Sequence, residues 1–318
     1  MLKTKNIFLF TLLVSPSLPS LLTLILLLII GGLLIPGFLL PDRVLALGQQ
    51  IAPLFLVALG QTFVVLIGGL DISVGAVLTL SLVLASGFMQ GREELAIPGI
   101  LLCLVIGCFI GLINGLLIQL LKLPSLIITI GMMSILQGIA WVYTNGAPGG
   151  SVPHSIRYLA NGRINIIPVA DLIILFVFLI FLFLIKHTIF GRYLYATGAN
   201  ADAARLSGLS INKITVGAYV ISSTLAALAG IMLAGYVGVG TLEAGGPYVL
   251  NSIAAVIIGG TKFSGGEGSI VGTVFGVFIL AVLTALLIQL GIPVALRSVI
   301  LSLIVVIAAI FQSKGIWR

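Results

Sequence analysis

Residues 97–121 read IPGILLCLVIGCFIGLINGLLIQLL, a run that contains no charged side chain. A helix needs about 20 apolar residues to cross the hydrocarbon core of a bilayer, at a rise of about 1.5 Å per residue. The run is long enough to do so. It therefore predicts a transmembrane helix.

Similar runs occupy most of the 318 residues, of which 60% are hydrophobic and 7% are charged. The mean hydropathy is +1.33, and soluble domains carry about 25% charged residues. The composition therefore predicts an all-α polytopic membrane protein. Ten transmembrane helices are expected at 20–40, 50–68, 72–90, 97–121, 124–143, 168–187, 214–234, 246–260, 268–289 and 294–312, as one transmembrane domain over 20–312.

Three segments differ from an ordinary span. Residues 1–19 carry Lys3 and Lys5 before a short apolar run, which predicts a cytoplasmic or interfacial segment rather than a cleaved signal peptide. Segment 246–260 is short and has a glycine pair at each end, which predicts a half-helix or re-entrant segment. Residues 313–318 form a short tail.

The positive charges predict the orientation. With the ten spans above, ten of the 15 Lys and Arg residues fall on the side of the N-terminus and five on the other side. Cytoplasmic loops are enriched in Lys and Arg. Both termini are therefore expected in the cytoplasm.

Two pairs of similar segments suggest two related halves. Leu-Leu-Ile-Gln-Leu occurs at 116–120 and again at 286–290. Gly68-Gly69 followed by Ser73-Val74-Gly75 is echoed by Gly259-Gly260 followed by Ser269-Ile270-Val271-Gly272. Transporters are often built from internal repeats, and chance similarity between apolar stretches is the alternative.

Catalytic, cofactor and metal signatures are absent from the sequence. It has no G-x-x-x-x-G-K-[ST] phosphate-binding loop, and His154 and His187 are far apart. Cys103 and Cys108 point to different faces of one helix, as small hydrophobic residues. The chain is not expected to be an enzyme or to hold a cofactor. Its acidic residues lie mainly at span ends or in loops, so ion-coupled transport has no visible machinery.

The longest polar connection, 188–213, contains a predicted two-turn helix at 201–207. Asn200 is a good N-cap, Asp202 lies near the positive helix end, and Gly208 suits a left-handed C-terminal stop. This loop is expected in the cytoplasm. A solvated connector is the alternative to a docking helix.

The pattern Gly-x-Asn-x-x-Ala-Ala-x-x-x-Gly at 198–208 resembles the coupling loop of bacterial ABC importer permeases of the ribose, or monosaccharide, type. Stretches that resemble the same family are Gly68–Gly75, Gly111–Gly115 and Ala254–Gly260 continuing to Ser264–Gly266. The resemblance covers about residues 45–312. It implies a multi-pass protein of the bacterial plasma membrane that works by alternating access.

The resemblance also implies partners: two cytoplasmic ABC ATPase subunits, a second permease chain, and an extracytoplasmic solute-binding protein. ATP hydrolysis would reside in the ATPase partner. The expected ATPase coupling helix comprises Asn200, Ala203, Ala204, Arg205, Leu206, Ser207 and Gly208. Outer loops 42–49, 91–96, 144–167 and 235–245 are the expected docking surface for the binding protein.

Two further sets of residues are candidates for the transport path. The expected cytoplasmic gate contains Gly69, Asp71, Ser73, Gly75, Gly259 and Gly260. Asp71 is interpreted there as a helix cap at the inner end of a span. Polar and aromatic side chains within spans are candidates for the solute path: Gln61, Asn114, Gln137, Trp141 and Asn251. Hydrogen bonding between helices is the alternative role for each of them.

The leading hypothesis is therefore a permease for ribose or a related monosaccharide. A furanose signalling molecule, a nucleoside or a branched-chain amino acid remains an alternative solute. A self-sufficient channel or carrier is the alternative from another class. The sequence leaves open the solute, the pairing of two identical or two different chains, and the number of host membranes.

Overall fold

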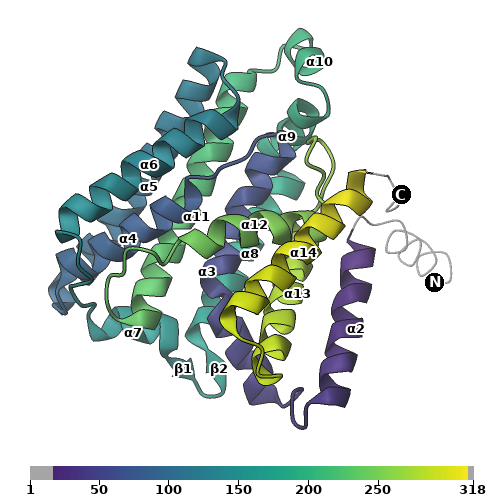
Figure 1. Ribbon diagram of the computed structural model, residues 1–318. Coiled ribbons are helices and arrows are strands. Elements are labelled where there is room, and N and C mark those ends of the chain that lie inside the picture. Colours follow the sequence, from purple (N-terminus) through teal and green to yellow (C-terminus); the bar gives the residue numbers. More distant parts are fainter. Residues whose placement is uncertain (1–16, 314–318) are drawn as a thin grey trace.

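The computed structural model describes residues 17–313 as a bundle of helices (Figure 1). Each expected span corresponds to one helix: α2 Leu18–Leu34, α3 Pro41–Leu66, α4 Val74–Met89, α5 Ala96–Leu121, α6 Ser125–Thr144, α8 Val169–His187, α11 Ile211–Val237, α12 Gly246–Ile258, α13 Ile270–Gln289 and α14 Val294–Ser313. The all-α polytopic fold class is confirmed. Of the segments expected at 1–19 and 313–318, residues 1–16 and 314–318 lie outside the described residues.

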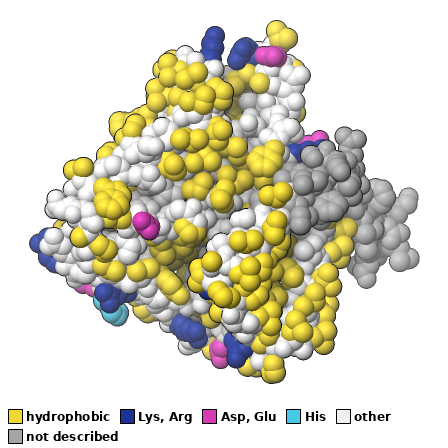
Figure 2. Space-filling model, in the orientation of Figure 1, with side chains coloured by type: hydrophobic (Ala, Val, Ile, Leu, Met, Phe, Trp, Pro, Cys, Tyr) yellow, Lys and Arg dark blue, Asp and Glu magenta, His cyan; other side chains and the backbone are white. Residues whose placement is uncertain are grey.

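Among the described residues, six of these helices are long and apolar enough to cross a membrane, and α2, α4 and α12 are shorter apolar helices. On the face shown in Figure 2, most Lys, Arg, Asp and Glu side chains lie at the upper and lower edges. Hydrophobic side chains form large patches in the band between them. This distribution is typical of a protein surrounded by lipid.

The connections contain structure that the sequence did not predict. The loop after α6 folds into α7, His154–Asn161, and a two-stranded antiparallel hairpin of β1 Arg163–Ile164 and β2 Ile167–Pro168. The 3₁₀ turn η1, Glu93–Leu95, precedes α5. In the loop of 188–213, α9 Ile189–Ala199 precedes α10 Ala201–Leu206. The side chain of Thr188 accepts a hydrogen bond from the Gly191 N–H and caps α9.

The two expected halves are present, with a constant offset of 170 positions. The helices α11, α12, α13 and α14 begin within four residues of the positions 170 after the starts of α3, α4, α5 and α6. The repeated Leu-Leu-Ile-Gln-Leu at 116–120 and 286–290 has the same offset. Gly68 and Gly238, also 170 apart, both have positive φ angles, of 76° and 87°. The second pair of similar segments, 68–75 and 259–272, does not share the offset.

The halves run in opposite directions. Gln49, near the start of α3, donates a hydrogen bond to the carbonyl of Ala160 in α7 (2.9 Å). Asn161, at the end of the same helix, donates to the carbonyl of Gly235 near the end of α11 (2.9 Å). The start of α3 and the end of α11 therefore lie at the same end of the bundle. The halves form an inverted repeat.

A pseudo-twofold axis passes between Gly75 and Gly245. A Cβ atom on Gly75 would lie 2.6 Å from the Gly245 carbonyl oxygen and 2.5 Å from the side chain of Val249. A Cβ atom on Gly245 would meet the Gly75 carbonyl oxygen and lie 2.5 Å from the Thr79 hydroxyl. Since Thr79 and Val249 are also 170 apart, the contacts are reciprocal, as they are across a twofold axis. The short helices α4 and α12 meet there, N-terminus to N-terminus.

The long helices pack mainly against the opposite half. Helix α11 packs against α4 and α5 of the first half, and α3 packs against α12 and α13 of the second. Helices α3 and α11 also pack against each other. Each half therefore surrounds the long helix of the other half.

Candidate functional site

Helix α10 has the local structure that the sequence predicts. Asn200 is its N-cap, and the Asn200 Oδ1 atom accepts a hydrogen bond from the Ala203 N–H (3.0 Å). Gly208, after its C-terminus, has a φ of 82°. Only Ala204 of the expected coupling set is buried, and Leu206 is 90% exposed. The helix projects beyond the ends of the other helices, at the top of Figure 1.

The N-cap has a testable stability contribution. Replacing Asn200 by alanine removes the side-chain acceptor of the Ala203 N–H at the start of α10, which costs about 1 kcal/mol of helix stability. We expect amide hydrogen exchange in Ala201–Leu206 to accelerate about fivefold, with no change in α11. Asn200→Asp, which keeps an acceptor oxygen, serves as the control. Equal exchange in the two variants would contradict the capping role.

Helix α9, which leads into α10, ends in a close three-way junction. A Cβ atom on Gly198 would overlap the Leu66 carbonyl oxygen and lie 2.5 Å from the Gly266 nitrogen. The Gly266 N–H donates to the same Leu66 carbonyl (2.8 Å), and the Tyr195 hydroxyl donates to the Gly268 carbonyl (2.9 Å). We call Gly198, Leu66 and Gly266 the glycine junction. It joins α9 to the end of α3 and to the α12–α13 loop.

Between α3 and α4 the chain is not helical, and residues Gly68–Ser73 return into the protein interior. We call them the first returning segment. The N–H groups of Gly68 and Gly69 donate to carbonyls at the end of α3, and side chains of other helices satisfy much of the remaining backbone. The Leu70 N–H donates to Ser125 (3.0 Å), the Ile72 N–H donates to Thr129 (3.2 Å), and the Leu70 carbonyl accepts from Tyr219 (3.2 Å). Irregular backbone at membrane depth requires such partners.

Asp71 is the centre of this segment and is fully buried. Its Oδ1 atom accepts from the Ser73 N–H (3.0 Å) and the Ser73 hydroxyl (2.6 Å), and its Oδ2 atom accepts from the Ser222 hydroxyl (3.0 Å). Three donors from two parts of the chain thus converge on one carboxyl group. Through its hydrogen bond with Ser222, Asp71 links the first returning segment to α11.

Asp71 lies deeper than expected. Its partner Ser222 is eleven residues after Ile211, the first residue of α11, or about 16 Å along the helix axis. The sequence placed Asp71 at the inner end of a span as a helix cap. The structure places it well inside the bundle, and the N-cap position of α4 belongs to Ser73, whose side chain caps no N–H.

Two of the expected solute-path residues take part in the same network. Asn114 is fully buried and donates to the Ser73 hydroxyl (3.0 Å). Gln61 is also fully buried. With its amide oriented to satisfy both groups, Gln61 bonds the Asp71 N–H (3.2 Å) and the Asp71 carbonyl (3.3 Å). In this conformation both amides bond to protein groups.

The other expected residues are dispersed. Gln137 and Trp141 are exposed on the outer face of α6, with Trp141 51% exposed. Gly69 lies against Tyr219, and Gly259 lies against Gly272 at the start of α13. Gly260, with a φ of 89°, ends the turn after α12.

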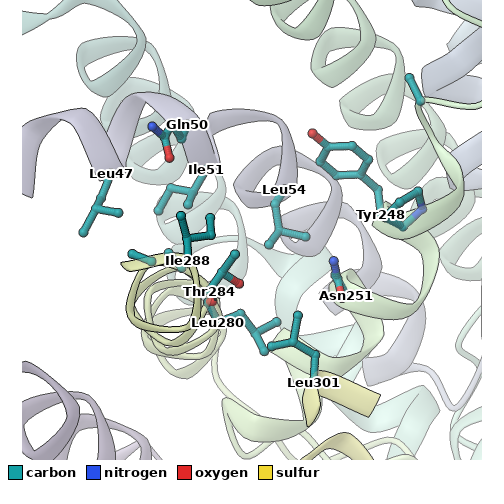
Figure 3. A pocket seen from close by; sticks show the side chains of 14 residues that line it. Leu47, Gln50, Ile51, Leu54, Tyr248, Asn251, Leu280, Thr284, Ile288 and Leu301 are labelled. Atoms are coloured by element: carbon teal, nitrogen blue, oxygen red, sulfur yellow. Dashed lines mark hydrogen bonds between the residues drawn. The ribbon is translucent and has the colours of Figure 1, made fainter. Parts of the chain in front are cut away.

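Asn251 borders a cavity of about 410 Å³ between α3, α12, α13 and α14. This volume is within the range of small-molecule sites. Its lining is mostly apolar, and its polar members are Gln50, Tyr248, Asn251 and Thr284. Figure 3 shows Tyr248 and Asn251 on one side of the cavity, Gln50 on the opposite side and Thr284 between them. Of these four residues, only Asn251 was predicted from the sequence.

The two halves differ in small residues at the cavity. In the first half a Cβ atom on Gly111 would lie 2.6 Å from the Val220 Cα, and one on Gly115 would lie 2.6 Å from the Val216 Cα, so α5 and α11 pack closely. The equivalent residues of α13, 170 positions later, are Ala281 and Ala285. Both alanines line the cavity.

The chain was compared with known families and proteins. A family model described as "Branched-chain amino acid transport system / permease component" matches residues 44–309. The ribose import permease protein RbsC of Bacillus subtilis (strain 168) is 38% identical over 293 residues, covering 92% of this chain and 91% of the relative. RbsC of Escherichia coli (strain K12) is 34% identical over 299 residues, 93% of each chain. The fructose import permease protein FrcC of Rhizobium meliloti is 33% identical over 303 residues, 92% of this chain and 84% of the relative. No solved structure matches this chain.

Proposed function

This chain belongs to the family of branched-chain amino acid transport system permease components, and from that premise we propose that it is the membrane subunit of an ATP-driven importer. It is a multi-pass transport permease. Alternating access of a path through the bundle would carry the solute, driven by ATP hydrolysis in a separate subunit.

The observation that carries the proposal is α10. A short helix that is capped at both ends, projects from the bundle and exposes Leu206 fits a groove on another protein. Its chain connection through α9 to the glycine junction offers a route from that partner to the bundle interior. Asn200, Ala203, Arg205 and Ser207 would surround Leu206 in the contact.

Ribose or a related monosaccharide is the proposed solute. Relatives named for ribose and fructose import cover more than nine tenths of this chain. The proposed assembly contains two ABC ATPase subunits, a second permease chain and an extracytoplasmic solute-binding protein. The chain would lie in the bacterial plasma membrane with both termini and α10 in the cytoplasm.

Replacing Leu206 by aspartate tests the role of α10. A charge at the centre of an apolar contact should lower co-purification of the co-expressed ATPase at least tenfold. ATP-dependent uptake of labelled ribose into proteoliposomes should fall in parallel. The chain should keep its thermal stability, because Leu206 is 90% exposed.

Leu290→Asp is the matched control. Leu290 is also exposed, and it follows α13 at the opposite end of the bundle. Normal ATPase binding by Leu206→Asp, or ribose uptake without any ATPase, would refute the proposal. Uptake of labelled leucine in place of ribose would retain the transport mechanism and change the solute class.

A further inference from the structure

The second half has a counterpart of the first returning segment. Residues Gly238–Glu243 are 170 positions after Gly68–Ser73 and lead from the end of α11 to the start of α12. We call them the second returning segment. Glu243 is its last residue and corresponds to Ser73.

The second returning segment enters the bundle beside α4. Its Gly240 lies against Ser86, because a Cβ atom there would be 2.5 Å from the Ser86 hydroxyl. Further along, the Gly245 N–H donates to Thr79 (3.0 Å). Ser86 and Thr79 are three and ten residues before the end of α4 at Met89. The segment therefore descends from about 5 Å to about 15 Å below that end.

Glu243 lies within this descending stretch and is exposed. In residues 17–313 its carboxylate makes no hydrogen bond or ion pair; the one ion pair found there joins Lys262 and Glu267. An ionised side chain at this depth is costly against lipid, and such residues almost always face a water-filled cavity or another polar group. The surface at Glu243 is therefore expected to face water rather than lipid.

Three of the side chains that hold the first segment are replaced by apolar residues around the second. The positions equivalent to Gln61, Thr129 and Ser222 are Ile231, Val299 and Ala52. None of these three residues can donate or accept a side-chain hydrogen bond. The second returning segment thus has Thr241 at the position of Asp71, carries its carboxyl group at Glu243 instead, and lacks three of the side chains that hold the first segment.

The cavity between α3, α12, α13 and α14 begins at the next residue, Ala244, and includes Tyr248 and Asn251. Among the described residues, the side chains of Gln50, Tyr248 and Asn251 make no hydrogen bond. Polar groups in apolar surroundings need partners. A cavity of this size with several convergent unpaired polar groups is the usual form of a small-molecule site.

We propose that Glu243 and this cavity form a binding site for a neutral polyhydroxylated solute inside the bundle. The proposal rests on the transport function proposed above, and it assigns the residues that would bind the solute during transport. A carboxylate accepts hydrogen bonds from hydroxyl groups, and the amides of Gln50 and Asn251 can both donate and accept. The same carboxylate repels anionic solutes. The Tyr248 ring supplies an apolar face and one hydroxyl group.

The first test measures contact with water. In a Cys108→Ala background, Glu243→Cys and Phe176→Cys are assembled with the ATPase in proteoliposomes and treated with a membrane-impermeant charged thiosulfonate. Phe176 is 66% exposed on α8 and serves as the lipid-facing control. We expect Glu243→Cys to react at least tenfold faster. Equal rates, or a disulfide between two copies at Glu243→Cys, would overturn the proposal.

The second test measures solute recognition. Glu243→Gln and Asn251→Ala should each lower ribose uptake more than tenfold at low ribose, while Glu243→Asp should retain part of it. Leu250→Ala, which changes an exposed apolar neighbour on α12, should be neutral. Unchanged uptake by Glu243→Gln would refute the assignment of Glu243.

Protection from labelling identifies the ligand class. In the Cys108→Ala background, millimolar ribose should slow labelling of Ala285→Cys, a lining position that supplies no polar group to the site, whereas ribose 5-phosphate, an anion, should not. Slowing by both sugars, or by neither, would contradict the proposed selectivity. ATPase co-purification should be normal in every variant, so failure of this site remains distinguishable from failure of the coupling proposal.

Discussion

Replacing Asp71 by alanine is expected to abolish transport and to lower the stability of the purified protein sharply. The change leaves the Ser73 N–H and the hydroxyls of Ser73 and Ser222 without their acceptor inside the bundle. Each buried polar group left unpaired costs about 1–3 kcal/mol. Thermal unfolding in detergent and ribose uptake in proteoliposomes measure the two effects.

Asp71→Asn is the informative control. The amide keeps the shape and one acceptor oxygen for Ser73, and the Ser222 hydroxyl can rotate to accept from the new NH₂ group. We expect this variant to retain most of its stability and uptake within about tenfold of the unchanged protein. An Asp71→Ala protein with normal stability and altered ribose affinity would show that Asp71 contacts solute rather than fastening the first returning segment.

Gly198→Ala is expected to separate ATP hydrolysis from transport. A methyl group at this position overlaps the Leu66 carbonyl and crowds the Gly266 nitrogen, and backbone atoms cannot rotate away. Helix α9 must then move from the glycine junction. Because α10 itself is unchanged, the ATPase should still bind and hydrolyse ATP, while ribose uptake should fall more than tenfold in the reconstituted complex.

Gly131→Ala provides the matched substitution. Gly131 lies within α6, and a Cβ atom there would meet nothing within 4 Å. Alanine favours helix over glycine by about 1 kcal/mol, so normal uptake and equal or higher stability are expected. Normal uptake by Gly198→Ala would show that the glycine junction does not transmit movement from the ATPase to the bundle. Loss of ATPase binding would show instead that the substitution disturbs α10.

Local signals in the sequence predicted much of the fold. Apolar runs located all ten expected spans, because a membrane helix needs a long uninterrupted run. Asn200 and Gly208 located the ends of α10, because caps depend on adjacent residues. The predicted separation of Cys103 and Cys108 is confirmed, with Cys103 buried and Cys108 exposed.

Depth within the bundle could not be predicted in the same way. Asp71 and Glu243 both follow apolar runs, so a hydropathy pattern assigns each to a loop outside the membrane. Both loops return inward because partners distant in sequence, such as Ser222 for Asp71 and Thr79 for Gly245, receive them. The offset of 170 positions between the halves aligns Gly68 with Gly238. It therefore indicates that the loops after α3 and α11 are equivalent.

The exchange of long helices between the halves has a consequence for how the chain is made. When synthesis has reached the end of α6, the surfaces of α4 and α5 that pack against α11 are still uncovered, and α3 has not yet met α12 or α13. The first half therefore cannot reach its final packing in the bilayer before the second half has been inserted. A chain truncated after α6 would therefore leave the glycine-lined face of α5 without the helix that covers it.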